Sequence, residues 1–420
     1  MQLGLGEEQE LLQRTFADLF AAESTPERVR AAEPAGFDPG LWKHLVETGA
    51  LGTRVPERLG GAGAGLLDAA VLAEEAGRWL ASAPLVEAIA VAALLAKLDG
   101  EAPRALLADV LAGRSVVTLA LLDACEAATQ LVPGGALADG VLALDGDALV
   151  LLRRPSGAGR SPLPNLGASP LERWRLDAAP VGGERVTLAR GEAAVRVQRA
   201  AREEWRLLTA AALTGLAQRA LEIGADYARS RVQFDRPIGA FQAIAHPLAD
   251  AATAVSAAQL LVRYAIWSIA TAQPEAAARV SFAFAAAAEG ASVATARALH
   301  AHGGYGLSLE YDVQLYFRRA KAWALAGGDP RDELLRAAWR LWRDEPPVPL
   351  PEAGPCPLDF DLGEDASRFA DEARRFFERE LTPELRARAS HSWDGHDEAF
   401  QKRLAQAGLL FPHWPRAYGG

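Results

Sequence analysis

The chain has 420 residues, of which 50% are hydrophobic and 7% aromatic, and its formal net charge is −10. This length allows two or three domains with large buried cores, and the acidic charge, spread along the chain, argues against a nucleic-acid-binding surface. The 2 cysteines exclude a disulfide framework or metal site, and no apolar run is long enough to span a bilayer, so the sequence predicts a soluble, cytoplasmic protein.

Residues 1–112 are predicted to form an N-terminal helical domain. Hydrophobic residues recur at helical spacing behind an acidic start at Glu7, and a later helix around Leu41 is predicted to stop at Gly49. A glycine-rich loop then precedes a helix predicted from about Leu66 to Leu80.

The hydrophobic period changes after residue 112. Short β-branched or leucine-rich runs alternate with Gly, Pro and Asp-Gly turns, which is typical of strands joined by tight connections. We therefore expect a small middle antiparallel β domain over residues 113–199. Its predicted strands are Val116–Leu122, Val141–Leu144, Ala148–Leu152, Val186–Leu188 and Ala194–Val197.

Helical patterns return in residues 200–345, which are predicted to form a C-terminal helical bundle. Pro274 suits the first turn of a helix, whereas Pro247 lies inside a predicted helix and is expected to kink it. The fold class is therefore mainly α with a small β domain. The helices predicted for the bundle are 203–231, 240–272, 274–302, 308–325 and 330–343.

A proline-rich stretch at residues 346–357 predicts a stiff, extended linker. The residues after it repeat the beginning of the chain. Leu362-Gly-Glu-Asp365 echoes Leu5-Gly-Glu-Glu8, and Thr382-Pro-Glu384 echoes Thr25-Pro-Glu27. After a two-residue insertion the similarity continues to Gly419-Gly420, which echoes a glycine pair of the first copy. We interpret residues 358–420 as a partial repeat of the N-terminal domain and expect the polypeptide to continue into a complete second unit.

Two motifs stand near the middle and the end of the predicted bundle. They read Ser230-Arg-Val-Gln-Phe-Asp-Arg-Pro-Ile-Gly-Ala-Phe-Gln-Ala-Ile244 and His300-Ala-His-Gly-Gly-Tyr-Gly306. Together with the order of the domains, they resemble the acyl-CoA dehydrogenase flavoprotein family. The resemblance implies FAD as the cofactor, acyl-CoA thioesters as substrates, α,β-dehydrogenation as the reaction and a four-helix bundle as the C-terminal domain.

In that family the flavin lies between two subunits, and the C-terminal helices of one subunit hold the pyrophosphate and adenosine of the other's cofactor. A guanidinium can fork across phosphate oxygens, and paired glycines let the backbone approach a ligand closely. A solvated arginine and a glycine helix cap are the simpler alternatives. The cofactor-binding residues that the resemblance implies are Arg231, Phe234, Gln242, His300 (where the family usually has Gln), Gly303 and Gly304.

The contacts that a subunit makes with its own flavin have no counterpart in this sequence. The family's Thr-Glu-Pro-x-x-Gly-Ser-Asp element should fall near residues 120–135, where the sequence reads Ala120-Leu-Leu-Asp-Ala-Cys-Glu-Ala-Ala-Thr129. The aromatic-Ile-Thr element that backs the flavin is not recognisable in Ala148–Arg154 either. We therefore expect the chain alone to hold little FAD.

Dehydrogenation needs a carboxylate that takes the α-proton while the β-hydride goes to the flavin. The register of the resemblance places the family's two alternative base positions on Gly327 and Trp205, neither of which can accept a proton. A small misregister leaves Glu204 and Asp329 as weaker alternatives. No histidine shows a nucleophile or metal-ligand pattern, and His302 is interpreted as a packed or solvated helix cap.

These features are interpreted as the non-catalytic half of an assembly of unlike acyl-CoA dehydrogenase units, which pair in cis or in trans. The expected partners are a homologous unit, an acyl-CoA and an electron-transfer protein. Relatives similar around Leu315–Lys321 serve actinobacterial steroid side-chain degradation, which suggests a bulky acyl group. A self-sufficient dehydrogenase with a displaced base and a structural or binding paralogue without flavin are the alternatives, and a flavin monooxygenase of the same fold is a more distant one.

Overall fold

The structure is a computed structural model that describes residues 1–343, 347–389 and 396–418. It divides into two compact units, one of Leu3–Leu358 and one of Met1–Gln2 with Asp359–Gly420. Residue 346 of the predicted linker and the Gly419-Gly420 pair of the predicted repeat lie outside the described residues. In the described ranges, no helix is both long and apolar enough to cross a membrane.

The N-terminal part of the first unit is helical, and local caps set its boundaries. The Asp38 carboxylate accepts hydrogen bonds from the N–H groups of Gly40 (2.9 Å) and Leu41 (3.1 Å) at the start of α3. Gly49 adopts a left-handed φ of 73° just beyond the end of α3, where the helix is predicted to stop. The helices are α1 (Glu7–Glu23), α2 (Pro26–Ala32), α3 (Pro39–Glu47), α4 (Leu66–Arg78), α5 (Leu85–Leu95) and α6 (Glu101–Leu111), with short 3-10 turns η1 (Ala50–Gly52) and η2 (Glu57–Leu59).

The middle region forms a four-stranded sheet, in the order β1-β3-β4-β6, and a separate pair of β2 with β5. The sheet is not purely antiparallel as predicted, because β1 pairs with β3 in parallel. The chain between these two strands leaves the sheet to form β2, and such a crossover permits parallel pairing. The strands are β1 (Val117–Leu119), β2 (Thr129–Val132), β3 (Gly140–Asp145), β4 (Ala148–Arg153), β5 (Glu172–Arg175) and β6 (Glu184–Arg190).

One other prediction for this region is wrong, and one pair of strands is not predicted. The run Ala194–Val197, predicted as a strand, belongs to α7 (Glu192–Ser230). Ala194, Gln198 and Ala201 are buried at helical spacing, and the Gln198 side-chain amide donates a hydrogen bond to a backbone carbonyl beside β1 (3.1 Å). The pair of β2 and β5 is missing from the prediction, because the polar Gln130 and Glu172 occupy buried positions and Leu131 an exposed one, which hides the alternation of a strand.

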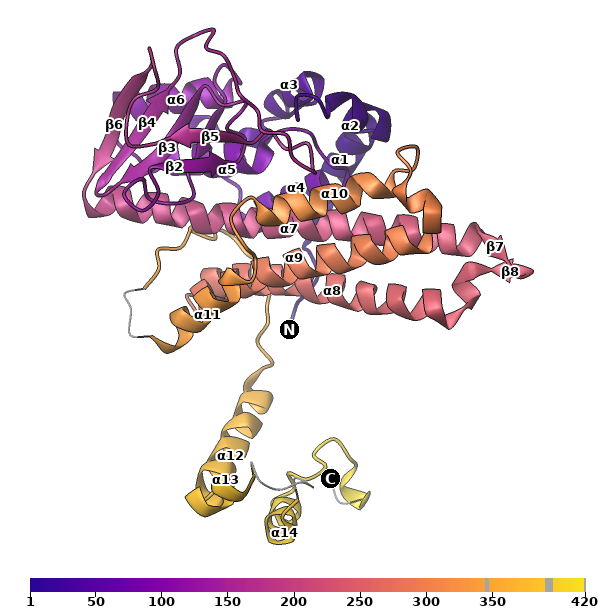
Figure 1. The fold of residues 1–420 in the computed structure, drawn as a ribbon. Helices are drawn as coiled ribbons and strands as arrows, with labels where there is room; N and C mark the ends of the chain where they lie inside the picture. The colour runs from indigo at the N-terminus through magenta and orange to yellow at the C-terminus, as the bar shows by residue number, and fades with distance from the viewer. Residues whose placement is uncertain (344–346, 390–395, 419–420) are drawn as a thin grey trace. The chain divides into compact units, whose positions relative to one another are not determined.

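The C-terminal helices pack lengthwise along α7, which runs beneath both the β strands and the N-terminal helices (Figure 1). This arrangement confirms the predicted fold class, a mainly helical protein with a small β region and a C-terminal bundle. Pro247 lies inside one helix, as predicted, but Pro274 precedes the next helix instead of occupying its first turn. The remaining elements are β7 (Val232–Gln233), β8 (Arg236–Pro237), η3 (Ile238–Ala240), α8 (Gln242–Ala270), α9 (Ala276–Ala301), η4 (Gly303–Leu307), α10 (Val313–Leu325) and α11 (Asp332–Trp342).

Helices α4 and α7 approach each other closely at two glycines. A Cβ atom on Gly77 would lie 1.9 Å from the carbonyl oxygen of Ala212, and one on Gly215 would lie 1.9 Å from that of Glu74. Neither position tolerates a side chain without separating the two helices. This contact fixes the N-terminal helices against the part of α7 that lines the cavity described below.

Ion pairs and hydrogen bonds of two buried glutamates hold α11 against α7 and α9. The Glu203 carboxylate accepts hydrogen bonds from Arg206 (2.6 Å) and Arg340 (2.7 Å), and Glu333 accepts them from Arg206 (3.1 Å) and Ser281 (2.8 Å). Glu203, Arg206, Glu333 and Ser281 are buried, and the Arg340 side chain is 9% exposed. Burial alone would raise the pKa of Glu203, but the two guanidinium groups hold it below its usual value.

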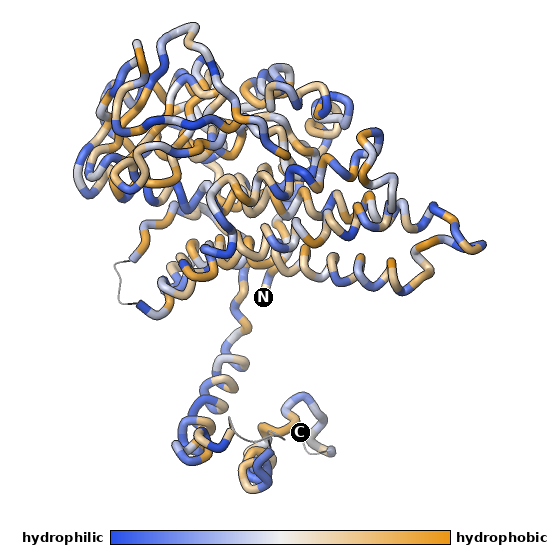
Figure 2. Tube along the Cα trace, in the orientation of Figure 1, coloured by the Kyte–Doolittle hydropathy of each residue, from blue (hydrophilic) through white to orange (hydrophobic). Residues whose placement is uncertain are grey.

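The second unit repeats the first three helices of the chain. Helices α12 (Glu364–Glu380), α13 (Pro383–Ala389) and α14 (Glu398–Gln406) have 17, 7 and 9 residues, the same lengths as α1, α2 and α3. Thr382 accepts a hydrogen bond from the N–H of the third residue of α13 (3.3 Å), as Thr25 does at α2 (3.5 Å). Most of α12 is hydrophilic (Figure 2), and a 3-10 turn, η5 (Arg416–Tyr418), follows α14.

Residues 347–358 pack against the first unit. The carbonyl oxygen of Ala353 accepts a hydrogen bond from the N–H of Leu66 at the start of α4 (2.7 Å), and the Ala353 side chain is buried. The Arg54 guanidinium donates to the backbone carbonyl of Glu352, whose carboxylate lies 2.9 Å from the Lys97 ammonium. These contacts make the segment part of the first unit.

Candidate functional site

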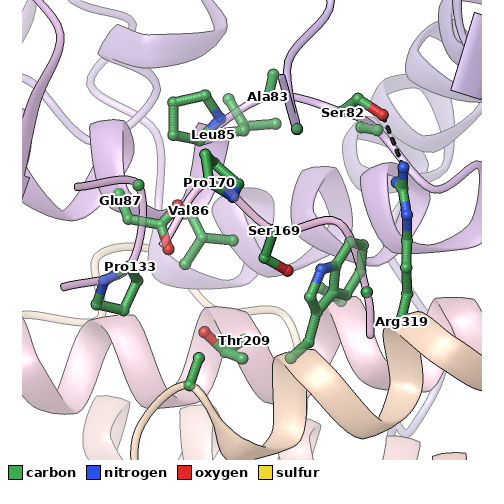
Figure 3. A pocket seen from close by; sticks show the side chains of 18 of the residues that line it. Ser82, Ala83, Leu85, Val86, Glu87, Pro133, Ser169, Pro170, Thr209 and Arg319 are labelled. Atoms are coloured by element: carbon green, nitrogen blue, oxygen red, sulfur yellow. Dashed lines mark hydrogen bonds between the residues drawn. The ribbon is translucent and has the colours of Figure 1, made fainter. Parts of the chain in front are cut away.

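A small cavity of about 110 Å³ lies where α7 meets the N-terminal helices and the loops of the β domain. Its walls come from the α4–α5 connection, the start of α5, residues 133–134 and 167–171, α7 and α10 (Figure 3). Glu87 and Arg319 lie on opposite sides of it (Figure 3). The lining is mainly apolar, and its polar residues besides Trp205 and Trp323 are Ser82, Glu87, Ser169, Thr209 and Arg319.

The structure brings together the two positions that the family register assigns to a base. Trp205 on α7 lines the cavity and is only 2% exposed. Gly327, just beyond α10, packs against its indole, because a Cβ atom at this position would lie 2.9 Å from Cζ3 and 3.2 Å from Cη2 of Trp205. An aromatic ring therefore occupies the place where both registers expect a carboxylate.

Glu87 is a carboxyl group of this cavity that the sequence analysis does not identify. It lies in the first turn of α5, and its Oε1 accepts a hydrogen bond from the indole Nε1 of Trp205 (3.1 Å). Burial raises the pKa of Glu87, and the hydrogen bond from Trp205 opposes this shift only in part. The one signal in the sequence is an acidic residue inside the otherwise apolar run Leu85–Leu95.

The two alternative carboxylates of the sequence analysis lie outside this cavity. Glu204 is buried, and its Oε1 accepts a hydrogen bond from Arg54 Nε (3.0 Å). Asp329 accepts three hydrogen bonds from the Arg331 guanidinium on the surface (3.0, 3.0 and 2.5 Å), and these bonds, with one from the Arg331 backbone N–H, lower its pKa to about 2. Each carboxylate is paired with an arginine, and neither lines this cavity.

Arg319 supplies a buried cation on the far side of the cavity from Glu87. It is 4% exposed and donates hydrogen bonds to the Ser82 hydroxyl (2.9 Å) and to the carbonyl oxygen of Leu80. Burial lowers its pKa to about 10, so the guanidinium stays protonated at neutral pH. The cavity thus combines one buried guanidinium with one carboxyl group whose pKa is raised by burial.

The six residues assigned to a neighbouring flavin lie at one end of the C-terminal helices, around the β7–β8 hairpin and the end of α9 (Figure 1). All six are exposed. The guanidinium carbon of Arg231 lies 5.8 Å from the centre of the Tyr305 ring, so the two motifs meet here. The residues are Arg231 at the end of α7, Phe234 in the hairpin, Gln242 at the start of α8, His300 in the last turn of α9, and Gly303 and Gly304 in η4.

The second motif is organised by a packed histidine. His302 is 5% exposed, stacks on Tyr227 with a ring separation of 4.1 Å, and has its Nδ1 2.8 Å from the carbonyl oxygen of Ala298. It is a packed cap residue, as interpreted from the sequence. Gly303 follows with a left-handed φ of 59°, the geometry of a helix cap. A Cβ atom on Gly303 or Gly304 would meet nothing within 4 Å, so this backbone is open to a ligand.

The segment that should hold the chain's own flavin uses its backbone donors internally. The N–H groups of Ala120 and Ala124 donate to carbonyl oxygens of β3 (2.8 Å each). The N–H of Leu122 donates to the Gln130 side chain (3.1 Å), which in turn donates to the Leu122 carbonyl (2.9 Å). These amides are satisfied within the fold. The exposed end of the bundle therefore fits an anionic cofactor better than this segment does.

Comparisons with known proteins identify the family. A family model of the acyl-CoA dehydrogenase C-terminal domain matches residues 195–337, and that of the acyl-CoA dehydrogenase N-terminal domain matches residues 6–113 and again 363–420. Acyl-CoA dehydrogenase IpdE2 of Mycolicibacterium smegmatis is 35% identical over 335 residues, which cover 79% of this chain and 98% of IpdE2. The chain belongs to the acyl-CoA dehydrogenase family.

Two further family members resemble the chain in informative ways. Acyl-CoA dehydrogenase FadE34 of Mycobacterium tuberculosis is 32% identical over 408 residues, which cover 91% of this chain but 51% of FadE34. The ChsE4-ChsE5 complex from Mycobacterium tuberculosis has a chain with a TM-score of 0.73 and 27% identity, covering 82% of this chain and 100% of its own length. The second match to the N-terminal domain confirms that the chain begins that domain twice.

Proposed function

We propose that this chain is a base-lacking unit of an acyl-CoA dehydrogenase assembly and that it completes the FAD site of a homologous unit. The contact between Trp205 and Gly327 carries the proposal, because the family takes its base from these two positions. The indole fills the space in front of Gly327, and a carboxylate at position 327 would collide with it. Proton abstraction therefore falls to the partner unit.

The exposed end of the bundle is the part of this chain that would face the partner's cofactor. FAD held at this place would supply the acceptor for the β-hydride of the thioester. Arg231 is suited to hold its pyrophosphate, since this guanidinium is exposed, lies beside Tyr305, and forms no ion pair with a carboxylate among the described residues. Gly303 and Gly304 leave their backbone accessible at the same place.

The substrate and the partners follow from the family. We assign acyl-CoA thioesters as the substrate class, with bulky acids of the steroid side-chain type suggested by the segment Leu315–Lys321. A homologous unit, in cis or in trans, supplies the base and the missing flavin contacts, and an electron-transfer protein reoxidises the flavin. The ChsE4-ChsE5 complex is a relative named for two components, which supports pairing between unlike units.

The test compares the chain purified alone with the chain co-expressed with a homologous unit that carries a glutamate at either base position. Flavin absorbance gives the FAD content, and reduction of an artificial electron acceptor by an acyl-CoA gives turnover. The chain alone should hold much less than one FAD and show no turnover, and the pair should gain both. A stable yellow chain with one FAD and full turnover by itself would refute the proposal, and a colourless pair would favour the non-flavin paralogue.

A second candidate function rests on Glu87, the carboxyl group beside Trp205. In a self-sufficient dehydrogenase it would act as the displaced base, because it lies in the cavity and its raised pKa makes its conjugate base a stronger proton acceptor. Glu87→Gln would then lower turnover by roughly 10²–10⁴-fold. Ser169→Ala, which changes a cavity residue that does not titrate, is the matched control. Under the base-lacking proposal neither change affects turnover of the paired assembly by more than a few-fold.

A further inference from the structure

A second, larger cavity lies on the opposite face of α7. It has a volume of about 680 Å³ and is lined by residues of η2, the end of α5, the first two turns of α6, the first turns of α7 and residues 350–354. Ala200 of α7 lines it, whereas Trp205 lines the first cavity. Five residues at about 100° each place these two side chains about 140° apart around the helix. The two cavities are therefore separate.

Basic side chains dominate the polar lining of this second cavity. Two of them are neutralised: Lys97 by the Glu352 carboxylate (2.9 Å) and Arg54 by Glu204 (3.0 Å). Three more come from three different elements, namely Arg58 from η2, Arg104 from α6 and Arg196 from α7. None of these three guanidinium groups forms an ion pair or hydrogen bond with any other described residue of the chain.

The charge around this cavity is opposite to that of the whole molecule. Asp99 is the one acidic lining residue besides Glu352, so the lining carries more positive than negative charge. The chain as a whole has a net charge of −10. The three arginines are exposed, so water screens their mutual repulsion, but each guanidinium can still pair with a bound anion. The three unpaired arginines thus favour an anionic ligand.

The remaining walls are apolar, and the volume is that of a small-molecule site. Ligand pockets typically measure about 300–1,000 Å³ and combine hydrophobic walls with a few polar anchors. A fully polar anion would leave the apolar walls without contacts. The apolar lining residues include Leu59, Leu95, Leu98, Leu107 and Val197.

We propose that this cavity binds a small amphipathic phosphate ester, with its phosphate on Arg58, Arg104 and Arg196 and its apolar part against the leucine-lined wall. A phosphate monoester carries about −1.5 to −2 charges at neutral pH, which matches several guanidinium groups better than a single carboxylate does. Guanidinium forks also fit phosphate oxygens geometrically. The site is independent of the flavin and of the proposed pairing with a homologous unit.

The test uses isothermal titration of the full chain with n-octyl phosphate, inorganic phosphate and octyl glucoside as probes. Octyl phosphate should bind saturably and at least tenfold more tightly than inorganic phosphate, and the uncharged glucoside should not bind. The double variant Arg104→Gln/Arg196→Gln should weaken octyl phosphate binding at least tenfold. Arg199→Gln, an exposed arginine on the same helix outside the cavity, should leave it within twofold.

Several results would overturn the proposal. These are absent or unsaturable binding of octyl phosphate, equal affinity in the double variant and wild type, or an equal loss in Arg199→Gln. If the double variant does not fold, judged by circular dichroism, Arg58→Gln replaces it with the same expectation. Arg231→Ala serves as a second control: it changes the flavin-facing end, so unchanged octyl phosphate binding in that variant separates this site from the proposed function.

Discussion

Gly327→Ala tests whether the indole of Trp205 and the glycine form one packed unit. The new methyl group would lie 2.9 Å from Cζ3 and 3.2 Å from Cη2 of Trp205, closer than normal van der Waals contact. Gly327 is itself exposed, but the methyl group would press on the buried Trp205 ring, and overpacking of this kind costs about 1–3 kcal/mol. Replacing glycine by alanine also lowers the conformational entropy of the unfolded chain, which stabilises the folded protein by about 0.4–1 kcal/mol. The free energy of unfolding should therefore fall by about 0.5–2 kcal/mol.

The assay is urea unfolding followed by circular dichroism, arranged as a double-mutant cycle. In Trp205→Phe the side chain lacks the Cζ3 and Cη2 atoms, so the alanine methyl gains room and the two changes should couple favourably by about 1 kcal/mol. Gly304→Ala is the control, because a Cβ atom there meets nothing within 4 Å. Equal stability of Gly327→Ala and wild type, or strict additivity in the cycle, would show that the two residues do not press on each other.

Three further predictions concern charged residues. Arg231→Ala in the paired assembly should lower FAD retention without unfolding the protein, and Arg231→Lys should recover only part of it; unchanged flavin absorbance in the alanine variant would indicate a solvated side chain. Glu204→Gln and Asp329→Asn should leave acyl-CoA turnover at matched flavin content nearly unchanged. A hundredfold loss of turnover in either variant would show that this chain carries the catalytic base. Glu203→Gln should destabilise the first unit by about 3–5 kcal/mol in urea unfolding, because it leaves Arg206 and Arg340 buried with a weakened partner. The pKa of Glu203 is lowered in the folded state, so the stability that its carboxylate contributes should be fully present above the usual glutamate pKa. That stability should be lost as the pH falls through the lowered pKa. Equal free energies of unfolding for Glu203→Gln and wild type from neutral to acidic pH would contradict this.

The sequence predicts most of the helices because their apolar faces recur at helical spacing. It fails where local patterns are ambiguous. The start of α7 contains a short run with β-branched residues, and only its packing against β1 through Gln198 shows that it is helical. The parallel pairing of β1 with β3 depends on the path of the chain between them, which no local pattern encodes.

The sequence indicates which positions belong to the candidate site, but it does not predict which of their side chains touch. Motif spacing identifies Trp205 and Gly327 separately, and only the fold shows that they touch. Glu87 is hidden within an apolar helix, where an acidic residue looks like a local exception. The three arginines of the second cavity come from distant parts of the chain, so their convergence has no signature in the sequence.

The contacts of residues 347–358 bear on how this protein should be divided for experiments. A fragment ending near residue 345 would strip the acceptor from the first amide of α4, since Ala353 supplies it, and would also remove the carbonyl of Glu352 from Arg54. Gly65 would lose its close neighbour at Pro355, whose carbonyl oxygen lies 2.7 Å from a Cβ placed on that glycine. These contacts therefore hold the proline-rich segment against the first unit. A cloning boundary placed after Leu358 preserves a closed folding unit, whereas one placed before the prolines cuts into it.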